Sequence, residues 1–223
     1  MHSHPSRQDI KAAADAAIFT VRDGRLCLLL IQMKKKPYAG RWALPGGLLG
    51  DEETSEGAAR RILRTQTGVT DGYLEQLMTF DDPKRDPLGR VISVGYFALL
   101  PSEGIRLRTT EKYADVRWWP VAKLPPLAYD HARIAKTALE RLRAKLEYTN
   151  IVSQLLAAVF PLSQLQGAYE DILGRRLDKR NFRKKILSLG LLAATGKTTS
   201  GGAHRPAELY RFKRKDLTVI EIL

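Results

Sequence analysis

The chain has little of what would place it outside the cell or in a membrane. Its 223 residues include one cysteine, Cys27, so no intramolecular disulfide can form. Cys27 lies in the apolar run 26–31 and is predicted to be a small core residue. No apolar run reaches the roughly 18 residues that span a bilayer, and the polar start MHSHPSRQDIK has no apolar core of a signal peptide. A cytoplasmic location is therefore expected.

The chain also has fewer acidic than basic residues. The chain has 24 Asp and Glu against 37 Lys and Arg, a net charge of +13. Residues 150–223 hold 13 basic and 6 acidic side chains, a net charge of +7, whereas the first 149 residues hold 24 and 18, a net charge of +6 over twice the length. This distribution favours a polyanionic partner for the C-terminal part, and a generally basic, solvated surface is the alternative.

One stretch, from Gly47 to Val69, combines a glycine-rich loop with a basic helix. Thr54 can cap this helix and Gly68 can end it, which predicts a helix over residues 55–67. Positions 62, 65 and 66 then share one helical face.

That face lacks the carboxylates that would hold a metal ion. It carries Ile62, Thr65 and Gln66, and none of these supplies the anionic oxygen that Mg²⁺ prefers. The same helix carries three arginines, Arg60, Arg61 and Arg64, which attract a diphosphate and repel a metal ion. The stretch therefore favours an anionic ligand over a metal ion.

The segments around this helix alternate between strands and turns. Strands are predicted over residues 12–21, 25–33, 42–44, 73–80, 91–100 and 116–119, with a hairpin at 23–24, a turn at 45–47, and a helix over 129–148. Mixed strands with one central and one terminal helix fit an α/β sandwich over residues 11–149, preceded by ten residues expected to be disordered. His2 and His4 in that segment are not expected to bind a metal.

From residue 150 the pattern changes to three short helices and a hairpin. The helices are predicted over residues 151–160, 164–173 and 179–189, with Asn150, Ser163 and Asp178 as caps, and the strands over 191–195 and 208–213. This order is typical of a winged helix-turn-helix domain over residues 150–223. Gly196-Lys197-Thr198 is not predicted to be a phosphate-binding loop. The preceding glycine, Gly190, is separated from Gly196 by five residues rather than four, and the segment leads into a strand rather than a helix.

The third of these helices is the candidate for reading DNA. Phe182, Ile186 and Leu189 would face the core, and polar and basic side chains near the N-terminal end would face outward into the major groove. The predicted DNA-binding residues are Lys179, Arg180, Asn181, Arg183 and Lys184 on this helix, Ser163 and Gln164 on the one before, and Lys197, His204 and Arg205 in the wing. A basic helix face that is only solvated is the alternative.

Basic and aromatic residues gather in loops around the first helix. Lys36, Arg41, Arg85 and Arg90, with Arg61 and Arg64 on the helix, are predicted to neutralise a diphosphate, and Trp42 and Phe80, with Tyr38 and Tyr96, to stack on a base. The alternative is that the aromatics belong to the core and the arginines pair with Asp81, Asp82 and Asp86. His131 is expected to pack or cap rather than to act as a base.

The 47–69 stretch resembles the Nudix box of nucleoside-diphosphate hydrolases. In that box a glycine, five residues, a glutamate and seven residues lead into Arg-Glu-apolar-any-Glu-Glu-any-Gly-apolar. The matching residues are Gly47, Glu53, Arg61, Leu63, Gly68 and Val69. Glu53 and Arg61 are expected to keep a structural ion pair. The other three glutamates would fall at positions 62, 65 and 66, so the chain is predicted not to be an enzyme.

Nearly the whole chain resembles the Nudix-related transcriptional regulators, particularly the regulators of NAD metabolism. The most specific stretches are RWALPGGLLGDEE, RDPLGRVISVGYFAL, LDKRNFRKK and HRPAELYRF. The resemblance implies a Nudix-like α/β/α sandwich that senses ADP-ribose or a related nucleotide and needs no cofactor. It also implies a homodimer whose winged helices bind a palindromic double-stranded operator as a repressor. The alternative is a Nudix hydrolase with a metal site built from Asp51, Glu52, Glu53 and Glu56.

Overall fold

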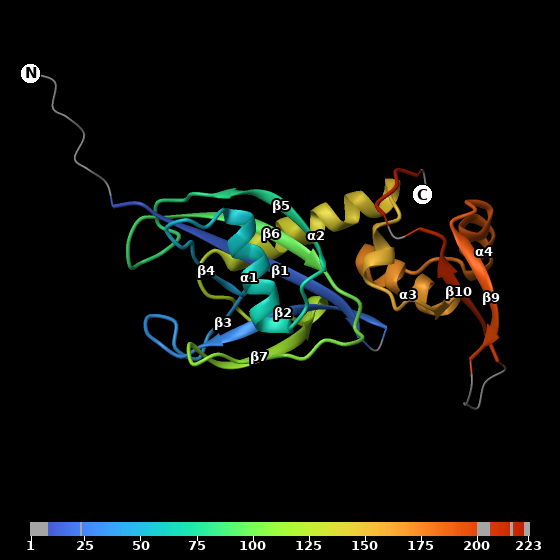
Figure 1. Cartoon of the computed structure of the whole chain (residues 1–223), viewed down its shortest axis with the longest axis horizontal. Helices are drawn as coiled ribbons and strands as arrows, with labels where there is room; N and C mark the ends of the chain where they lie inside the picture. Colours follow the sequence, from blue (N-terminus) through green and yellow to red (C-terminus); the bar gives the residue numbers. More distant parts are fainter. Residues whose placement is uncertain (1–8, 23, 200–205, 215, 221–223) are drawn as a thin grey trace, which may run out of the picture.

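The computed structural model describes residues 9–22, 24–199, 206–214 and 216–220. Figure 1 shows a larger unit that contains a sheet with helices α1 and α2, and a smaller unit with α3, α4 and the β9–β10 ribbon. The predicted α/β architecture with a C-terminal winged helix is confirmed. No helix among the described residues is long and apolar enough to cross a membrane.

The large sheet is organised around its first strand. β1 (Lys11–Arg22) forms the predicted antiparallel hairpin with β2 (Arg25–Met33) and lies parallel to β6 (Val91–Leu99) on its other side. β6 pairs in turn with β5 (Tyr73–Phe80). On the far side, β2 pairs with β3 (Trp42–Ala43) and β7 (Tyr113–Pro120).

The predicted turn at residues 45–47 is wrong in part, because this segment forms a short strand. β4 (Gly46–Leu48) pairs with β1, and Gly47 lies opposite Ala14. A Cβ atom on Gly46 would lie 1.9 Å from Asp15 Oδ1, so only glycine permits this approach. The strand depends on a partner about 30 residues earlier, which local turn signals do not reveal.

Two helices cover opposite faces of the sheet. α1 (Ser55–Thr67) begins and ends where the sequence predicts, because Thr54 Oγ1 accepts a hydrogen bond from Gly57 N at 3.0 Å and Gly68 adopts φ 74°. α2 (His131–Tyr148) starts two residues later than predicted. Tyr129 takes a left-handed φ of 54° there, which a continuous helix cannot include.

Alternation along β1 separates the two cores. Ala14, Ala16 and Ile18 pack in the cluster that contains α1 side chains. Ala17, Phe19 and Val21 pack in the cluster that contains α2 side chains. Asp15 therefore points toward the α2 side, where the N-terminus of that helix meets the sheet.

In the C-terminal unit the predicted helix over residues 151–160 is wrong. Only a 3-10 helix forms, η2 (Ile151–Gln154), and residues 160–161 form strand β8 (Phe160–Pro161), which pairs with β10. Pro161 disfavours helical backbone at the residue before it, and the Phe160 ring packs 5.3 Å from that of Phe212. Asn150 does not cap η2. Its side chain instead binds the chain at residues 216 and 218.

The helix-turn-helix pair and the ribbon follow. α3 (Leu162–Leu173) starts after Pro161, so Ser163 lies in its first turn and does not cap it as predicted. α4 (Lys179–Ser188) has the predicted cap, because Asp178 Oδ1 accepts a hydrogen bond from Asn181 N at 2.8 Å. β9 (Leu192–Thr198) and β10 (Glu208–Phe212) form the antiparallel ribbon.

The α2 core continues without a break into the C-terminal unit. One cluster includes Phe19 and Leu28 of the sheet, Leu142 of α2 and Tyr169 of α3. Polar contacts cross the same boundary. The carboxylate of Asp171 accepts a hydrogen bond from Leu26 N, and Arg143 Nε donates to the carbonyl of Ile172 at 2.7 Å. The two units are therefore joined by packed side chains as well as by the chain itself.

Candidate functional site

A buried carboxylate lies at the centre of the larger unit. Asp15 is 5% exposed, and its Oδ2 accepts hydrogen bonds from Arg85 Nη2 at 3.0 Å and from Ser93 Oγ at 2.7 Å. His131 Nε2 lies 3.5 Å from Oδ1. Burial of an unpaired carboxylate is costly, and these partners offset that cost at Asp15.

Arg85 connects this carboxylate to the start of α2. Its guanidinium donates to Asp130 through Nε at 3.1 Å and Nη2 at 2.8 Å, in addition to Asp15. Asp130 is the residue before that helix, but its side chain caps no backbone N–H and instead holds Arg85. The loop between β5 and β6 is thereby fixed against the sheet and α2.

His131 has a defined tautomer. Leu44 N donates a hydrogen bond to its Nδ1 at 2.9 Å, so the ring proton lies on Nε2, which faces Asp15. Burial lowers the pKa of His131, and the nearby Asp15 opposes this only in part. The neutral ring therefore packs and orients, as expected from the sequence.

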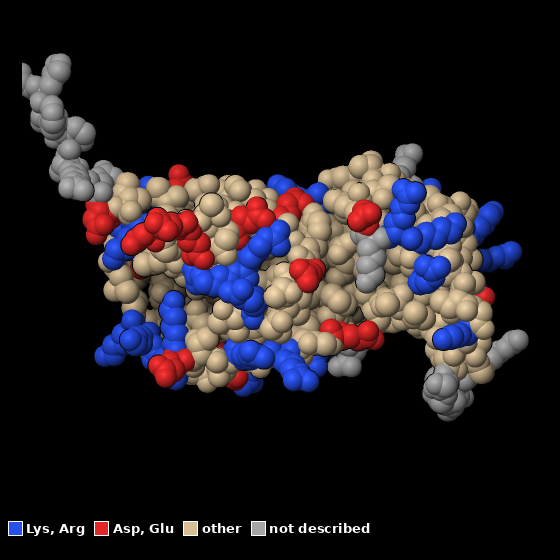
Figure 2. Space-filling view, viewed as in Figure 1, with Lys and Arg blue, Asp and Glu red and all other residues tan. Residues whose placement is uncertain are grey.

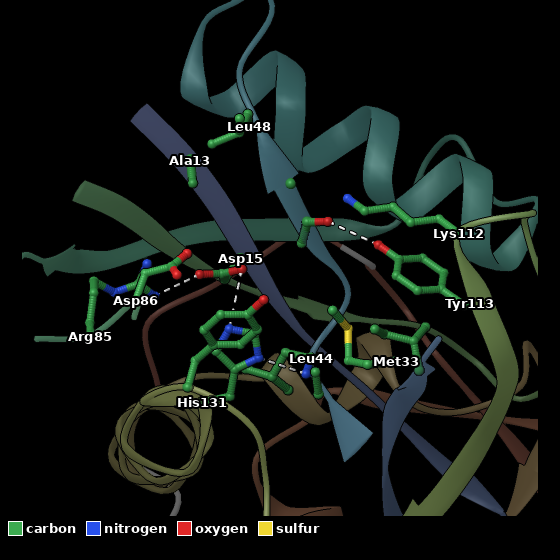
Figure 3. A pocket seen from close by; sticks show the side chains of 15 residues that line it. Ala13, Asp15, Met33, Leu44, Leu48, Arg85, Asp86, Lys112, Tyr113 and His131 are labelled. Carbon is green, nitrogen blue, oxygen red and sulfur yellow. Dashed lines mark hydrogen bonds and ion pairs between the residues drawn. The ribbon is translucent and has the colours of Figure 1, made fainter. Parts of the chain in front are cut away.

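A cavity of about 160 Å³ opens above these residues. Figure 3 shows Asp15, Arg85 and His131 on one side of it and Lys112 and Tyr113 on the other. Tyr129 also lines it, with its ring centroid 4.5 Å from that of Tyr38 and 5.1 Å from that of His131. This series of rings offers aromatic surface at one edge of a polar cavity, which suits a nucleobase.

A second cavity, of about 380 Å³, adjoins the first along the face of α1. The two share Gly46, Gly47, Leu48, Lys112 and Tyr113. The second is also lined by Arg61, Ile62, Thr65, Gln66 and Thr110. We refer to it as the box-helix cavity. Tyr113 lines both cavities, and its hydroxyl donates to the carbonyl of Gly46 at 3.1 Å. Burial raises its pKa to about 12.

The predicted ion pair beside the box-helix cavity is present. Arg61 donates to Glu53 through Nε at 2.8 Å and Nη2 at 2.7 Å. Glu53 Oε2 also accepts from Gly50 N at 3.1 Å. The hydrogen bond from Arg61 and then that from Gly50 lower the pKa of Glu53 to about 2. This pair fixes the glycine loop onto α1.

The alternative metal site in this loop has little support in the geometry. Glu53 is paired with Arg61, and Glu56 is paired with Arg60 at 2.7 Å. Over the part of the chain that the structure describes, no three His, Cys, Asp or Glu side chains are grouped so as to hold a metal ion.

The structure separates the predicted effector-binding residues into three groups. Arg61 lines the box-helix cavity and Arg85 lines the cavity above Asp15. Lys36, Arg41 and Arg64 are exposed, and Arg90 Nη1 donates to the carbonyl of Asp81. Trp42 packs edge-on against Trp119, 5.3 Å between centroids, with Arg117 over its ring.

Three of the sequence predictions need correction. Phe80 is 1% exposed in the main core, so it offers no face to a base. The guanidinium of Arg85 pairs with Asp15 and Asp130 rather than being free for a diphosphate. Tyr96 is also buried, with its hydroxyl 2.8 Å from Ser55 Oγ.

Sequence reasoning missed Asp15, Lys112 and Tyr113. Asp15 was detectable in principle, because it is the one acid in the apolar run from 12 to 21, and a charge in a buried strand needs a partner. Nothing local marks Lys112 or Tyr113, since the pairing of β7 with β2 brings Tyr113, and Lys112 just before it, to the cavity.

The candidate DNA interface lies at the other end of the molecule. Phe182 and Ile186 of α4 are buried, whereas the predicted DNA-binding side chains Lys179, Arg180, Asn181, Arg183 and Lys184 are all exposed. Figure 2 shows Lys and Arg gathered on this end of the molecule. Exposed basic side chains in the first turns of a helix suit phosphate and base contacts.

The neighbouring predicted residues extend this surface. Ser163 is exposed, and with Lys179 and Arg183 it lines a hollow between α3, α4 and β10. Gln164 is half-buried on α3, and Lys197 is exposed on β9. His204 and Arg205, like His2 and His4, lie outside the described residues.

Comparison with known proteins finds a family match for each unit. Residues 11–142 match the NUDIX domain family, and residues 152–212 match the NrtR DNA-binding winged helix domain family. The ADPR responsive transcriptional repressor NtrR of Acinetobacter baylyi is 37% identical over 206 residues, which are 91% of this chain and 82% of the relative.

Solved structures show the same likeness. Shewanella oneidensis NrtR complexed with a 27mer DNA is 34% identical, with a TM-score of 0.79 over 91% of this chain and 93% of that one. The NUDIX domain of the same protein complexed with ADP ribose is also 34% identical, with a TM-score of 0.56 over 63% of this chain and 94% of that one.

Proposed function

Because the chain belongs to the Nudix-related transcriptional regulators, which join a NUDIX domain to an NrtR-type winged helix domain, we propose that it is a transcriptional repressor responsive to ADP-ribose. The observation that carries this proposal is that one chain holds both an exposed basic helix in a winged helix unit and a polar cavity in a Nudix unit. Of the relatives that match both units, one is named as an ADPR responsive repressor and one was solved in complex with DNA, and the NUDIX domain of the second was solved with ADP ribose.

The winged helix unit supplies the DNA-binding surface. We assign it to residues 150–223 and the effector-sensing unit to residues 11–149. α4 inserts its N-terminal end into the major groove, where arginine suits guanine and asparagine suits adenine. Lys197 on β9 lies where a wing contacts the phosphate backbone. A homodimer would present two such helices to a palindromic operator, and genes of NAD metabolism are the expected targets.

The Nudix unit supplies the effector site. The aromatic rings of Tyr38 and Tyr129 suit the adenine, and the cationic side of the box-helix cavity suits the diphosphate. The residues of the Nudix box do not fit the Mg²⁺ that hydrolysis requires, because positions 62, 65 and 66 hold Ile, Thr and Gln. We therefore propose that the chain binds ADP-ribose without hydrolysing it. As a DNA-binding protein, the chain would act in the compartment that holds the DNA. This agrees with the cytoplasmic location expected from the sequence.

One titration tests sensing, DNA binding and hydrolysis together. Labelled DNA from the protein's own upstream region is titrated with the full chain, with and without ADP-ribose, and AMP release is followed in the same samples with Mg²⁺. We expect specific binding that ADP-ribose weakens and no AMP release. AMP release that Glu53→Gln or Glu56→Gln abolishes would favour the hydrolase instead.

Variants of α4 test the DNA-reading helix. Arg180→Ala and Arg183→Ala should each weaken operator binding by about 1–3 kcal/mol if the side chain contacts a base. Lys136→Ala on α2 is the control, because it removes the same charge from an exposed side chain in the other unit. If both α4 variants bind specific and random DNA as tightly as this control does, the assignment of α4 is wrong.

A further inference from the structure

The box-helix cavity carries positive charge where a Nudix hydrolase would carry a metal ion on carboxylates. Arg61 and Lys112 line it, and none of its lining residues is acidic over the part of the chain that the structure describes. Ile62 is buried in the α1 core, so it cannot bind a cation. A divalent ion would be repelled here rather than held.

Lys112 lies over the glycine loop of the box. Its Nζ is 3.9 Å from the place that a Cβ on Gly47 would take, and Figure 3 shows its side chain extending toward β4. No described carboxylate pairs with it. Because Lys112 lines both cavities, its ammonium lies where a ligand that spans the two would pass.

Arg61 is less available than Lys112. Its Nε and Nη2 donate to Glu53, and Nη2 also donates to the carbonyl of Leu48 at 3.2 Å. The carboxylate of Glu53, 2.7 Å away, offsets its charge. Lys112 therefore provides the larger share of free positive charge at this position, as a compact cation with three donors.

The same cavity contains polar atoms without partners. Gln66 Oε1 and Thr110 Oγ1 are buried and have no hydrogen-bond partner among the described residues. Gln66 is 4% exposed and occupies the last glutamate position of the box. Buried polar groups are rarely left unpaired. Because Gln66 Oε1 can only accept a hydrogen bond, it suits a hydroxyl of the ligand beside the phosphates rather than the phosphate oxygens themselves.

We propose that Lys112 takes the place of the divalent metal ion and binds the diphosphate of the effector, so that effector binding needs no metal. This inference rests on the proposed function and deepens it. The ammonium neutralises the phosphate oxygens without activating a water, since it is not a Lewis acid. Binding and hydrolysis are thereby separated in the same cavity.

Calorimetric titration of the full chain with ADP-ribose tests this inference. Wild-type protein should bind with the same Kd in EDTA and in Mg²⁺. Lys112→Ala should raise that Kd roughly 10- to 100-fold, as expected for loss of a charge-assisted contact, and Lys112→Arg should restore part of the affinity. Lys123→Ala, which removes an exposed lysine in the 3-10 helix η1 (Val121–Lys123), is the matched control and should bind as wild type.

The outcomes separate this inference from the proposed function. Wild-type binding that weakens more than tenfold in EDTA, or a Lys112→Ala variant that matches Lys123→Ala, would overturn the role of Lys112 and leave the effector intact. No binding of ADP-ribose by the wild type in either buffer would overturn the effector assignment itself. Lys112 is exposed, so its variants should fold, and near-ultraviolet circular dichroism checks this.

Discussion

Replacing Arg85 with alanine should destabilise the protein by about 3–5 kcal/mol, the usual cost of breaking a buried ion pair by removing one partner. Arg85 is 6% exposed and pairs with Asp15 at 3.0 Å and with Asp130 at 2.8 Å. Without it, the carboxylate of Asp15 stays buried with only the Ser93 hydroxyl and a neutral His131 beside it. That uncompensated charge is the source of the cost.

The assay is urea unfolding followed by far-ultraviolet circular dichroism, with thermal unfolding in parallel. At roughly 2–4 °C per kcal/mol for a chain of this size, the Tm should fall by about 6–20 °C. Arg117→Ala is the matched control. It breaks an Arg–Asp pair in which the arginine is 58% exposed, which should cost no more than about 1 kcal/mol.

A second substitution identifies the cause. Adding Asp15→Asn to Arg85→Ala removes the buried charge and should recover part of the lost stability, since the two residues are in contact. If Arg85→Ala costs no more than Arg117→Ala, or if Asp15→Asn only adds to the loss, then Asp15 is not held as a buried charge by Arg85.

Three further outcomes follow from the same structure. Gly46→Ala should cost about 1–3 kcal/mol in urea unfolding and weaken ADP-ribose binding, because its Cβ would lie 1.9 Å from Asp15 Oδ1; wild-type values for both would refute this. Burial raises the pKa of Tyr113 from 10.0 to about 12, so its contribution to stability is complete below pH 10 and is lost as the pH rises toward 12. Between pH 10 and pH 12 the free energy of unfolding should therefore fall less for Tyr113→Phe than for wild type. An equal fall in both proteins would contradict the raised pKa of Tyr113. Asp178→Ala should lower the stability of the winged helix unit by about 1 kcal/mol, while Asp178→Asn keeps the cap on Asn181 N; equal thermal stability of the two variants would contradict this.

Local signals predicted most of the fold. The hairpin of β1 and β2, the caps of α1 and the cap of α4 all depend on neighbouring residues, and each forms as predicted. The errors occur where the local structure depends on residues far away in the sequence. Phe160 joins a sheet with β10, about 50 residues later, and Gly46 pairs with β1. Periodicity and propensity contain no information on such pairings.

The site was harder to predict than the fold for the same reason. The sequence identified the box helix and its missing carboxylates, because these are properties of one segment. It did not identify the group formed by Asp15, Arg85 and His131, whose members lie on three elements. Phe80 was predicted to contact the ligand from its position in the chain, but it is buried in the core.

The continuous core gives α2 a mechanical role. Its first residue, His131, lines the cavity above Asp15, and its last turn packs in the same cluster as α3. The helix has 18 residues, so it is about 27 Å long, and a tilt of about 5° at the cavity would move the far end by roughly 2 Å. In the proposed homodimer, two such displacements would change the distance between the two α4 helices, which must match one turn of DNA. A ligand that shifts the start of α2 by a fraction of an ångström would thus act on the operator through leverage, without unfolding either unit.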